Sequence, residues 1–382
     1  MDALFPPAVY IDHDTAFRDL VRQLSTEPLI AIDTESNSLY AYRERVCLVQ
    51  ISTRSADYII DPLRIADMTP LGSLLADPKI EKVFHAAEYD LICMKRDYGF
   101  KATNLFDTMV TARIIGHKFI GLNRLLGEYL SVEADKSHQR DDWGQRPLTE
   151  EGLRYAQMDT HFLPELRDIL LAQLDEKGLL TEARETLAEA CDVPVIVNEF
   201  DPDGYWRIGT PADLSRRQMA ILRELYLLRD RLARERDCPS FKVFNDQVMI
   251  AIAENAPTAT NELHRIKGMS GQQVRRYGRQ LLQAVERGRR SPTPHPPARP
   301  PDLDPDLVER FTVLREWRKL RAEQRGVESD VIISKEALWA VASKLPTTIE
   351  DLSDIEGLGP WRLSAYGEEL VDKMKPFQDG AT

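Results

Sequence analysis

The sequence predicts an α/β domain with a mixed sheet, followed by two all-α domains. Up to about residue 190, short apolar runs alternate with longer helical patterns, as expected for a sheet with helices on its faces. From Asp213 onward the strand pattern disappears and apolar residues recur at helical spacing. This later part also repeats itself: Ala256-Pro257 and Tyr277-Gly278 are matched by Leu345-Pro346 and Tyr366-Gly367, each at a spacing of 89 residues. Two copies of one helical module account for the repeat.

Four strands are expected in the first part of the chain, because short apolar runs there are bounded by polar residues. The second and third runs flank the short connection Thr53–Ser55, which favours antiparallel pairing in part of the sheet. The sheet should therefore be mixed. The predicted strands are Leu29–Thr34, Val46–Ser52, Asp57–Ile60 and Lys82–His85.

Helical patterns lie between and after these runs, and several begin with Asp, Asn or Thr in the capping position. Thr149 is the cap of greatest interest, because the helix after it carries candidate functional residues. The predicted helices are Asp14–Leu24, Ala87–Tyr98, Asp107–Ile115, Leu122–Leu130, Glu150–Met158 and Leu163–Leu174.

A proline-rich stretch separates the two helical copies. Ser291–Pro301 holds six prolines in eleven residues, which disfavours helix and sheet and predicts an extended connector. We therefore expect the α/β domain at residues 1–190, the first helical domain at 211–290, a linker at 291–303 and the second helical domain at 304–378.

Charge is unevenly distributed along the chain. The formal net charge is −12, yet residues 205–290 carry 17 Lys and Arg against 9 Asp and Glu. That stretch has a net charge of +8, which leaves −20 for the remainder. A basic module attracts polyanions, whereas its acidic surroundings repel them unless cations bind there. The asymmetry therefore suggests a metal.

Export and membrane insertion are not indicated. No apolar run approaches the length that spans a bilayer, and residues 1–10 lack a basic start followed by an apolar block. The four cysteines are widely spaced without a C-x-x-C pair, so neither a disulfide framework nor a zinc site is signalled. We expect buried thiols in a cytoplasmic protein, and a monomer, since no feature demands an oligomer.

The sharpest chemical signal is a pair of carboxylates, Asp33 and Glu35, at the end of an apolar strand. Residues at i and i+2 of a strand point to the same side of the sheet. Two carboxylates held so close repel one another unless a divalent cation lies between them, and Mg²⁺ and Mn²⁺ prefer oxygen ligands. An isolated Asp-x-Glu is more often a polar strand end.

Three further residues follow in order along the chain. Asp90 lies near the first turn of the helix after the fourth strand, where an acid also favours the helix dipole. Tyr155 and Asp159 are four residues apart, so they share one face of the helix capped by Thr149. Each feature alone is ordinary. Together they place four acids and a tyrosine on a strand end, a helix start and a helix face.

This set resembles the DEDD superfamily of 3′–5′ exonucleases, and Tyr155 is typical of its DEDDy branch. The resemblance covers most of residues 25–175 and implies a ribonuclease H-like, or DnaQ-like, exonuclease domain. The helical copies resemble the HRDC domains found at the C-terminus of ribonuclease D and RecQ-type helicases. The segments that resemble the ribonuclease D family are Asp135-Lys136-Ser137, Asp142-Trp143, Arg146-Pro147-Leu148-Thr149 and Tyr155-Ala156.

The resemblance implies a site with two divalent metal ions, Mg²⁺ or Mn²⁺. One metal would generate and position hydroxide, and the other would stabilise the leaving 3′ oxygen. By the same resemblance, Asp33 would bridge both metals. Glu35 and Asp159 would hold the metal on the nucleophile side, and Asp90 would support the second. Tyr155 would orient the attacking water, because a phenol with a pKa of about 10 is a poor base at neutral pH.

The implied substrate is RNA with a free 3′ end, such as a tRNA precursor, and the implied products are nucleoside 5′-monophosphates. The preference for RNA rests on the family, so a DNA 3′–5′ exonuclease is the alternative enzyme. A non-catalytic RNA-binding scaffold is the other alternative, and the presence of all four acids and the tyrosine argues against it. Many bacterial ribonuclease D sequences carry Phe after the motif Glu, whereas this chain has Ser36, followed by Asn37. This Glu-Ser-Asn form resembles the nuclear exosome-associated relatives, which leaves the fine substrate preference open.

In the first helical copy, Lys267, Arg275 and Arg276 flank the turn Gly268–Gly271. Backbone N–H groups at a helix start can receive phosphates there, so we expect these residues to bind RNA. A solvated basic face is the alternative. The second copy lacks most of these charges, which favours packing, length selection or partner contact. His85 ends a buried strand, and we interpret it as structural.

Overall fold

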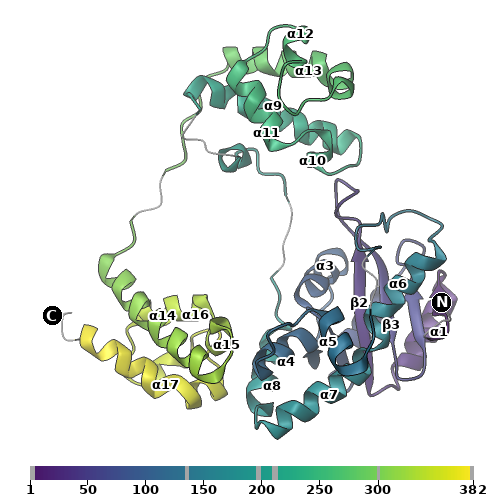
Figure 1. Ribbon diagram of the computed structural model, residues 1–382, viewed down its shortest axis with the longest axis vertical. Coiled ribbons are helices and arrows are strands. Elements are labelled where there is room, and N and C mark those ends of the chain that lie inside the picture. The colour runs from purple at the N-terminus through teal and green to yellow at the C-terminus, as the bar shows by residue number, and fades with distance from the viewer. Residues whose placement is uncertain (1–4, 134–136, 195–198, 209–213, 299–301, 379–382) are drawn as a thin grey trace. The chain divides into compact units, whose positions relative to one another are not determined.

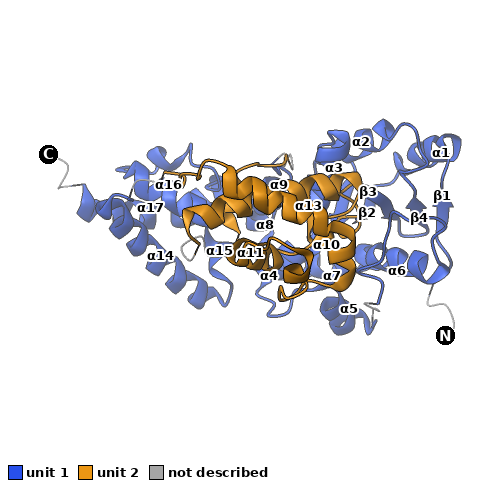
Figure 2. Cartoon of the chain, turned by 90° about the horizontal axis from the view of Figure 1, so that it is seen from above, with its two compact units in different colours: residues 1–35, 46–196, 301–382 blue, residues 36–45, 197–300 orange. Residues whose placement is uncertain are grey.

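The computed structural model describes residues 5–133, 137–194, 199–208, 214–298 and 302–378 (Figure 1). Asp135 and Lys136 of the motif, the expected start of the first helical domain at residue 211 and part of the linker lie outside these ranges. The chain forms two compact units, coloured in Figure 2. One comprises residues 1–35, 46–196 and 301–382, and the other residues 36–45 and 197–300. The second helical copy therefore shares a unit with the α/β domain.

A six-stranded mixed sheet forms the centre of the α/β domain, in the order β1-β4-β3-β2-β5-β6. β3 and β4 are antiparallel, whereas β1 with β4, β2 with β5 and β5 with β6 are parallel. The mixed sheet and its antiparallel part are confirmed. The strands are β1 (Val9–Ile11), β2 (Leu29–Ser36), β3 (Val46–Ser52), β4 (Asp57–Ile60), β5 (Glu81–Phe84) and β6 (Leu105–Asp107).

Strands β1 and β6, which are only three residues long, were not predicted from the sequence. An alternating pattern cannot be recognised over three residues, so the neighbouring strands decide whether such a segment pairs. The fourth predicted strand, Lys82–His85, is shifted by one residue, since β5 begins at Glu81 and ends at Phe84.

The two faces of the sheet bury separate cores, and β2 contributes to both. Ile30 and Ile32 belong to one core, whereas Leu29 and Ala31 belong to the other. This alternation follows from the two-residue repeat of a strand. Helices α1 to α3 contribute to the core of Ile30, and α4, α5, α7 and α8 contribute to the core of Leu29.

The helices of this domain include all six predicted segments and two that were missed, α2 and α8. The predicted helix at Glu150–Met158 continues to His161. None of the helices in the described ranges is long and apolar enough to cross a membrane. The helices are α1 (Asp14–Leu24), α2 (Thr69–Ala76), α3 (Glu88–Tyr98), α4 (Thr108–Ile115), α5 (Leu122–Leu130), α6 (Glu150–His161), α7 (Leu163–Glu176) and α8 (Leu180–Glu189).

Helix α6 begins with a side-chain cap and is fixed to the sheet by a buried polar contact. The Thr149 hydroxyl accepts a hydrogen bond from the backbone N–H of Gly152 at 3.0 Å, which confirms the predicted cap. The buried Gln157 Nε2 donates to Asp57 Oδ2 on β4 at 2.7 Å. Such partners are needed, because burying a polar group without a hydrogen bond costs about 1–3 kcal/mol. The cap fixes where α6 begins, and the contact of Gln157, which lies between Tyr155 and Asp159, fixes the helix on the sheet.

The two helical copies have the same order of elements. Helices α13 and α17 begin at Gly271 and Pro360, again 89 residues apart. The turns before them contain Gly268 and Gly357 with φ of +85° and +81°, a conformation that favours glycine. The first copy contains α9 (Arg216–Glu235), α10 (Ser240–Val243), α11 (Asp246–Asn255), α12 (Thr260–Leu263) and α13 (Gly271–Arg290). The second contains α14 (Pro305–Arg325), α15 (Ser329–Ile332), α16 (Lys335–Lys344), the 3-10 helix η3 (Glu350–Leu352) in the place of α12, and α17 (Pro360–Met374).

The cysteines follow the prediction with one exception. Cys47, Cys93 and Cys238 are buried, and none of them is in a disulfide. Cys191 is partly exposed, because it lies just after α8 ends and only one side of this segment packs on the core of Ile30. The expectation that all four are buried was wrong for this residue.

Candidate active site

Three of the predicted acids meet at the end of the central strand β2. Ligand atoms of Asp33, Glu35 and Asp159 all lie within 4.8 Å of one another. Asp33 and Glu35 continue the series of Leu29 and Ala31, so their side chains point to the same face of the sheet. Asp159 reaches them from α6. We call these three residues the acid cluster.

Asp90 approaches the same strand from α3. Thr34 lies between the two acids of β2 and points to the opposite face of the strand, and its hydroxyl donates a hydrogen bond to Asp90 Oδ1. Asp90 is buried near the start of α3. The hydrogen bond fixes this carboxylate beside the strand end. Thr34 is a positioning residue that the sequence analysis did not single out.

The carboxyl groups of the site lie in an environment that disfavours their charge. Burial, followed by the charge of a neighbouring carboxylate, raises the pKa of Asp33 and of Asp90 well above the usual range. Burial and then Asp33, Asp159, Asp90 and Asp141 raise the pKa of Glu35 to about 10. Burial and Asp90 raise the pKa of Asp159 to about 7. Each ionised carboxylate therefore makes ionisation of the others less favourable.

No Lys, Arg or His among the described residues forms an ion pair with the acid cluster. Carboxylates that are crowded together and half-buried without such a partner are neutralised either by protons or by a bound cation. Carboxylate oxygens are the ligands that Mg²⁺ and Mn²⁺ prefer. The residues present therefore fit divalent metal ions.

Tyr155 lies one helical turn before Asp159, beside the acid cluster. Burial, followed by the charges of Asp159, Glu35 and Asp33, raises the pKa of its phenol, so the hydroxyl stays protonated at neutral pH. Its ring stacks on Trp143 with a centroid distance of 6.0 Å and an interplanar angle of 29°. Trp143 is buried and limits the positions that the ring can take. Trp143 belongs to one of the motifs found in the sequence, but its packing against the Tyr155 ring was not predicted.

The segment that carries Trp143 is anchored by an ion pair. Arg146 Nε and Nη2 donate to the two oxygens of Asp61 at 2.6 and 2.8 Å, and Nη2 also donates to the Cys47 carbonyl at 2.9 Å. Burial favours a higher pKa for Asp61, but the hydrogen bonds from Arg146 and Tyr10 outweigh it and lower the pKa. A two-pronged guanidinium–carboxylate pair fixes direction as well as distance. The Arg-Pro-Leu-Thr motif thus holds α6 and Trp143 at the sheet.

Asp107 stabilises the turn that presents Asp90. Its Oδ1 accepts hydrogen bonds from the N–H groups of Ala86 and Met109 at 3.1 and 2.8 Å, and its Oδ2 accepts one from Ala87 at 2.7 Å. Ala86 has a φ of +63°, a conformation that is strained for a residue with a Cβ. The sequence predicted Asp107 only as the beginning of a helix. Its bonds to the preceding turn join α3 and α4 at the site.

His85 has structural partners. Its Nδ1 lies 2.9 Å from the Thr108 hydroxyl, which in turn donates to the Phe84 carbonyl at 3.0 Å. Burial lowers the pKa of His85 to about 4, so the ring is neutral at pH 7. These contacts support the structural interpretation of this residue.

The three basic residues predicted to bind RNA lie in the first helical copy. Lys267, Arg275 and Arg276 are all exposed, around the start of α13. A Cβ added to Gly271, the first residue of α13, would lie 3.9 Å from Arg275 Nη1, so this guanidinium lies beside the helix start. Positive charge and backbone N–H groups are therefore presented together.

Comparison with known protein families agrees with the order of domains. A family model described as a 3′-5′ exonuclease matches residues 8–175. A model described as the HRDC domain matches twice, at residues 218–285 and 308–373. The exonuclease fold implies the use of divalent metal ions.

Individual relatives match almost the whole chain. Ribonuclease D of Pseudomonas paraeruginosa is 30% identical over 377 residues, which cover 97% of this chain and 98% of that protein. Ribonuclease D of Gluconacetobacter diazotrophicus is 31% identical over 96% of this chain and 93% of its own. A similar solved structure is the crystal structure of Escherichia coli RNase D, described as an exoribonuclease involved in structured RNA processing. The match covers 97% of this chain and 100% of that chain, with 28% identity and a TM-score of 0.65.

Proposed function

The chain belongs to the ribonuclease D family and is a 3′–5′ exoribonuclease, and on this premise we propose that it cleaves 3′-terminal phosphodiester bonds with two divalent metal ions. The observation that carries the proposal is the acid cluster, three half-buried carboxylates without a cationic side chain as partner among the described residues. The metals would be Mg²⁺ or Mn²⁺, held by Asp33, Glu35, Asp90 and Asp159. The products would be nucleoside 5′-monophosphates.

Each acid of the site has a distinct position relative to the substrate in this proposal. When bound, the metals supply a water of lowered pKa and positive charge for the leaving 3′ oxygen. Asp33 would serve both metals, as the resemblance to the family implies. Glu35 and Asp159 serve the side of the attacking water. Asp90, held by Thr34, serves the side of the leaving group.

Tyr155 positions the attacking water in this account. Its raised pKa keeps the hydroxyl protonated, so the phenol donates a hydrogen bond and does not remove a proton. Trp143 holds the ring against the acid cluster. A hydroxyl in a fixed direction lowers the entropic cost of aligning water with the phosphorus atom.

The substrate is RNA with a free 3′ end, and tRNA precursors are the class that we propose. Lys267, Arg275 and Arg276 of the first helical copy bind phosphates of this RNA. We propose that the protein acts as a cytoplasmic monomer. We also propose domain boundaries at residues 1–190, 211–290 and 304–378, with a linker at 291–303.

Digestion of 5′-labelled single-stranded RNA tests the proposal. We expect a ladder that shortens from the 3′ end in Mg²⁺ or Mn²⁺ and is absent in EDTA, with a 3′-phosphate block and for Asp33→Asn. The matched control Asp175→Asn, at an exposed residue of α7, keeps full activity. RNA binding without digestion would identify a scaffold and contradict the proposal. Equal digestion of a DNA strand of the same sequence would favour the DNA exonuclease.

A further inference from the structure

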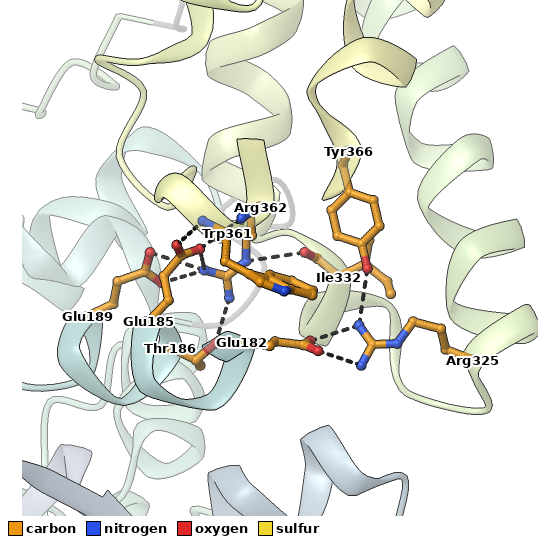
Figure 3. A network of polar contacts seen from close by, with 9 residues as sticks. All are labelled: Glu182, Glu185, Thr186, Glu189, Arg325, Ile332, Trp361, Arg362 and Tyr366. Carbon is orange, nitrogen blue, oxygen red and sulfur yellow. Dashed lines mark hydrogen bonds and ion pairs between the residues drawn. The ribbon is translucent and has the colours of Figure 1, made fainter. Parts of the chain in front are cut away.

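Helix α8 of the exonuclease domain presents three carboxylates to the second helical copy (Figure 3). Glu182, Glu185 and Glu189 recur at helical spacing, so they lie on one face of α8. The second copy meets this face with Arg325, the last residue of α14, and with the first turn of α17. Both sides of the contact belong to the same compact unit.

The first contact is a two-pronged ion pair. Arg325 Nη1 and Nη2 donate to Glu182 Oε1 and Oε2 at 2.7 and 2.8 Å, and Nη1 also donates to the Tyr366 hydroxyl at 3.1 Å. The Glu182 side chain is 1% exposed. A carboxylate so deeply buried requires its partner, because an unpaired buried charge is strongly unfavourable. The pair therefore fixes the end of α14 on α8.

The second contact closes the N-terminus of α17. Glu185 Oε2 accepts a hydrogen bond from the backbone N–H of Trp361 at 2.6 Å, and Oε1 accepts one from the N–H of Arg362 at 3.2 Å. The N-cap residue of α17 is Gly359, which has no side chain for this purpose. A Cβ on Gly359 would lie 2.3 Å from Glu185 Cδ. A residue of another domain thus occupies the capping position.

The third contact neutralises Arg362 itself. Its Nη1 donates to the two oxygens of Glu189 at 3.1 and 2.9 Å, and its Nη2 donates to the Thr186 hydroxyl at 3.0 Å. The guanidinium is buried between α8 and α17 (Figure 3). The positive charge of Arg362, near the start of α17, is therefore neutralised by the carboxylate of Glu189.

The two positions that α8 contacts have equivalents in the first copy, 89 residues earlier. Ser270 stands where the second copy has Gly359, and it caps α13 in a capping box with Gln273. Arg236 stands where the second copy has Arg325, and it keeps the hydrogen bond to the equivalent tyrosine, Tyr277. Arg236 is exposed, however, whereas Arg325 is paired with the buried carboxylate of Glu182. The carboxylates of α8 thus contact the second copy at two positions. At these positions the two copies have equivalent residues in the fold, but the second copy is contacted by α8.

Apolar packing supports the same contact. Val331 of α15 is buried in the core of the exonuclease domain that contains Leu29 and Ala31. A Cβ on Gly116, at the end of α4, would lie 3.2 Å from the Gly326 carbonyl at the end of α14. Arg113 of α4 also pairs with Asp330 of α15. The second copy is thus joined to this domain by its core as well as by charge.

We propose that α8 is a docking helix whose carboxylates occupy the anion-accepting groups of the second helical copy. Glu185 and Glu189 take the places that phosphate oxygens would take at the start of a helix with an adjacent arginine. The second copy thereby becomes a fixed part of the catalytic unit, and its positive groups are withheld from RNA. This part of the inference rests on the proposed function, whereas the docking itself does not.

Hydrogen exchange in the full-length protein without RNA tests the docking. In Glu185→Gln/Glu189→Gln, we expect the Trp361 and Arg362 amides to exchange at least about tenfold faster than in wild type, because opening of the contact exposes them. Glu176→Gln, at an exposed residue of α7, is the matched control and leaves these rates unchanged. Unchanged rates in the double variant would overturn the proposal.

Gly359→Ala tests the same contact from the other side, since its Cβ would collide with Glu185. Gly121→Ala is the control: Gly121 is also a helix N-cap, with φ of −69° against −68° for Gly359, and a Cβ there meets nothing within 4 Å. We expect faster exchange of the Trp361 amide only in Gly359→Ala. Equal exchange in the two variants would contradict a close contact at this position.

The claim that the positive groups of the second copy are withheld from RNA is tested by RNA binding. The ligand is a single-stranded RNA blocked by a 3′-phosphate, and its binding is measured at several salt concentrations. In Glu185→Gln/Glu189→Gln we expect tighter binding and a salt dependence steeper by about 0.7 for each arginine released. Faster exchange with an unchanged salt dependence would overturn the claim that these groups are withheld from RNA. Absence of RNA binding by the wild type would contradict the proposed function, while the exchange result would still decide the docking.

Discussion

At the scale of single residues, the alternation of a strand explains most of the site. Asp33 and Glu35 were predictable as a pair, because β2 buries Leu29 and Ala31 on the same face. The hydrogen bond from Thr34 to Asp90 was not predictable, since it depends on how α3 packs on the other face. Asp107 was likewise recognised only as a helix start, because its bonds to the preceding turn are tertiary contacts.

Removing the ionisable group of Asp33 should stabilise the metal-free protein. The pKa of Asp33 is raised in the folded state, so its contribution to stability is present below the usual Asp pKa and is lost as the pH rises. At pH 7 Asp33→Asn should therefore raise Tm in EDTA by about 3 °C while lowering kcat by at least about 10²-fold. Calorimetry checks the first value. A lower Tm in EDTA would contradict the account.

Metal binding should release protons and strengthen with pH. Glu35, with a pKa of about 10, is protonated at pH 8, and Asp159, with a pKa of about 7, is largely protonated at pH 6. We expect Mn²⁺ affinity to rise by about tenfold or more per pH unit between pH 6 and 8, since ligands must lose protons. Calorimetry in buffers of different ionisation enthalpy counts the protons. Affinity independent of pH would refute the raised pKa values.

Tyr155→Phe should separate the positioning of the attacking water from the binding of RNA. Loss of the hydroxyl should lower kcat by about 10²-fold and leave KM within about twofold, because the phenol acts on the attacking water and not on the rest of the RNA. Tyr58→Phe, which loses a hydrogen bond from Gln23 in the same domain, is the control. An unchanged kcat in Tyr155→Phe would remove this residue from the mechanism.

At the scale of elements, the long amphipathic helices and the buried strands were predictable, because their patterns extend over several turns or alternations. The short β1 and β6 were not, since their hydrogen bonds to β4 and β5 define them. Helix α8 was missed as well, and its role depends on partners in the second helical copy that are distant in sequence.

The turn between β5 and α3 gives a prediction at this scale. Asp107→Ala should destabilise the protein by about 1 kcal/mol through the lost cap of α4, and should also lower kcat because Ala86 and Ala87 lose their acceptors. Asn245→Ala, which removes the cap of α11, should cost similar stability and leave kcat unchanged. Steady-state kinetics at saturating metal compares them. Equal kcat in the two variants would show that the turn does not position Asp90.

At the scale of the whole molecule, the sequence predicted the repeat, the proline-rich connector and the uneven charge. Which copy shares a unit with the exonuclease domain was not predictable, because both copies retain similar apolar patterns. The difference lies in single positions, such as Gly359 against Ser270, and in the carboxylates of α8. The roles of these residues become recognisable only when the contact between α8 and the second copy is known.

The basic first copy should carry much of the salt dependence of RNA binding. Replacing Arg275 and Arg276 with Ala should weaken binding of blocked RNA and reduce the salt slope by about 0.7 per residue. Lys319→Ala, at an exposed residue of α14, serves as the control and should have little effect. Filter binding at several salt concentrations measures both. An unchanged slope in the double variant would place the phosphate contacts elsewhere.

The central claim is that the acids at the end of β2 hold two catalytic metal ions. Counting bound Mn²⁺ by electron paramagnetic resonance at pH 8 tests it most directly, with wild type, Asp33→Asn and the exposed control Asp175→Asn. The account predicts two ions per chain in wild type and in the control, and at least about tenfold weaker binding in Asp33→Asn, which costs about 1.4 kcal/mol or more. The same number of ions bound with the same affinity in Asp33→Asn would contradict it.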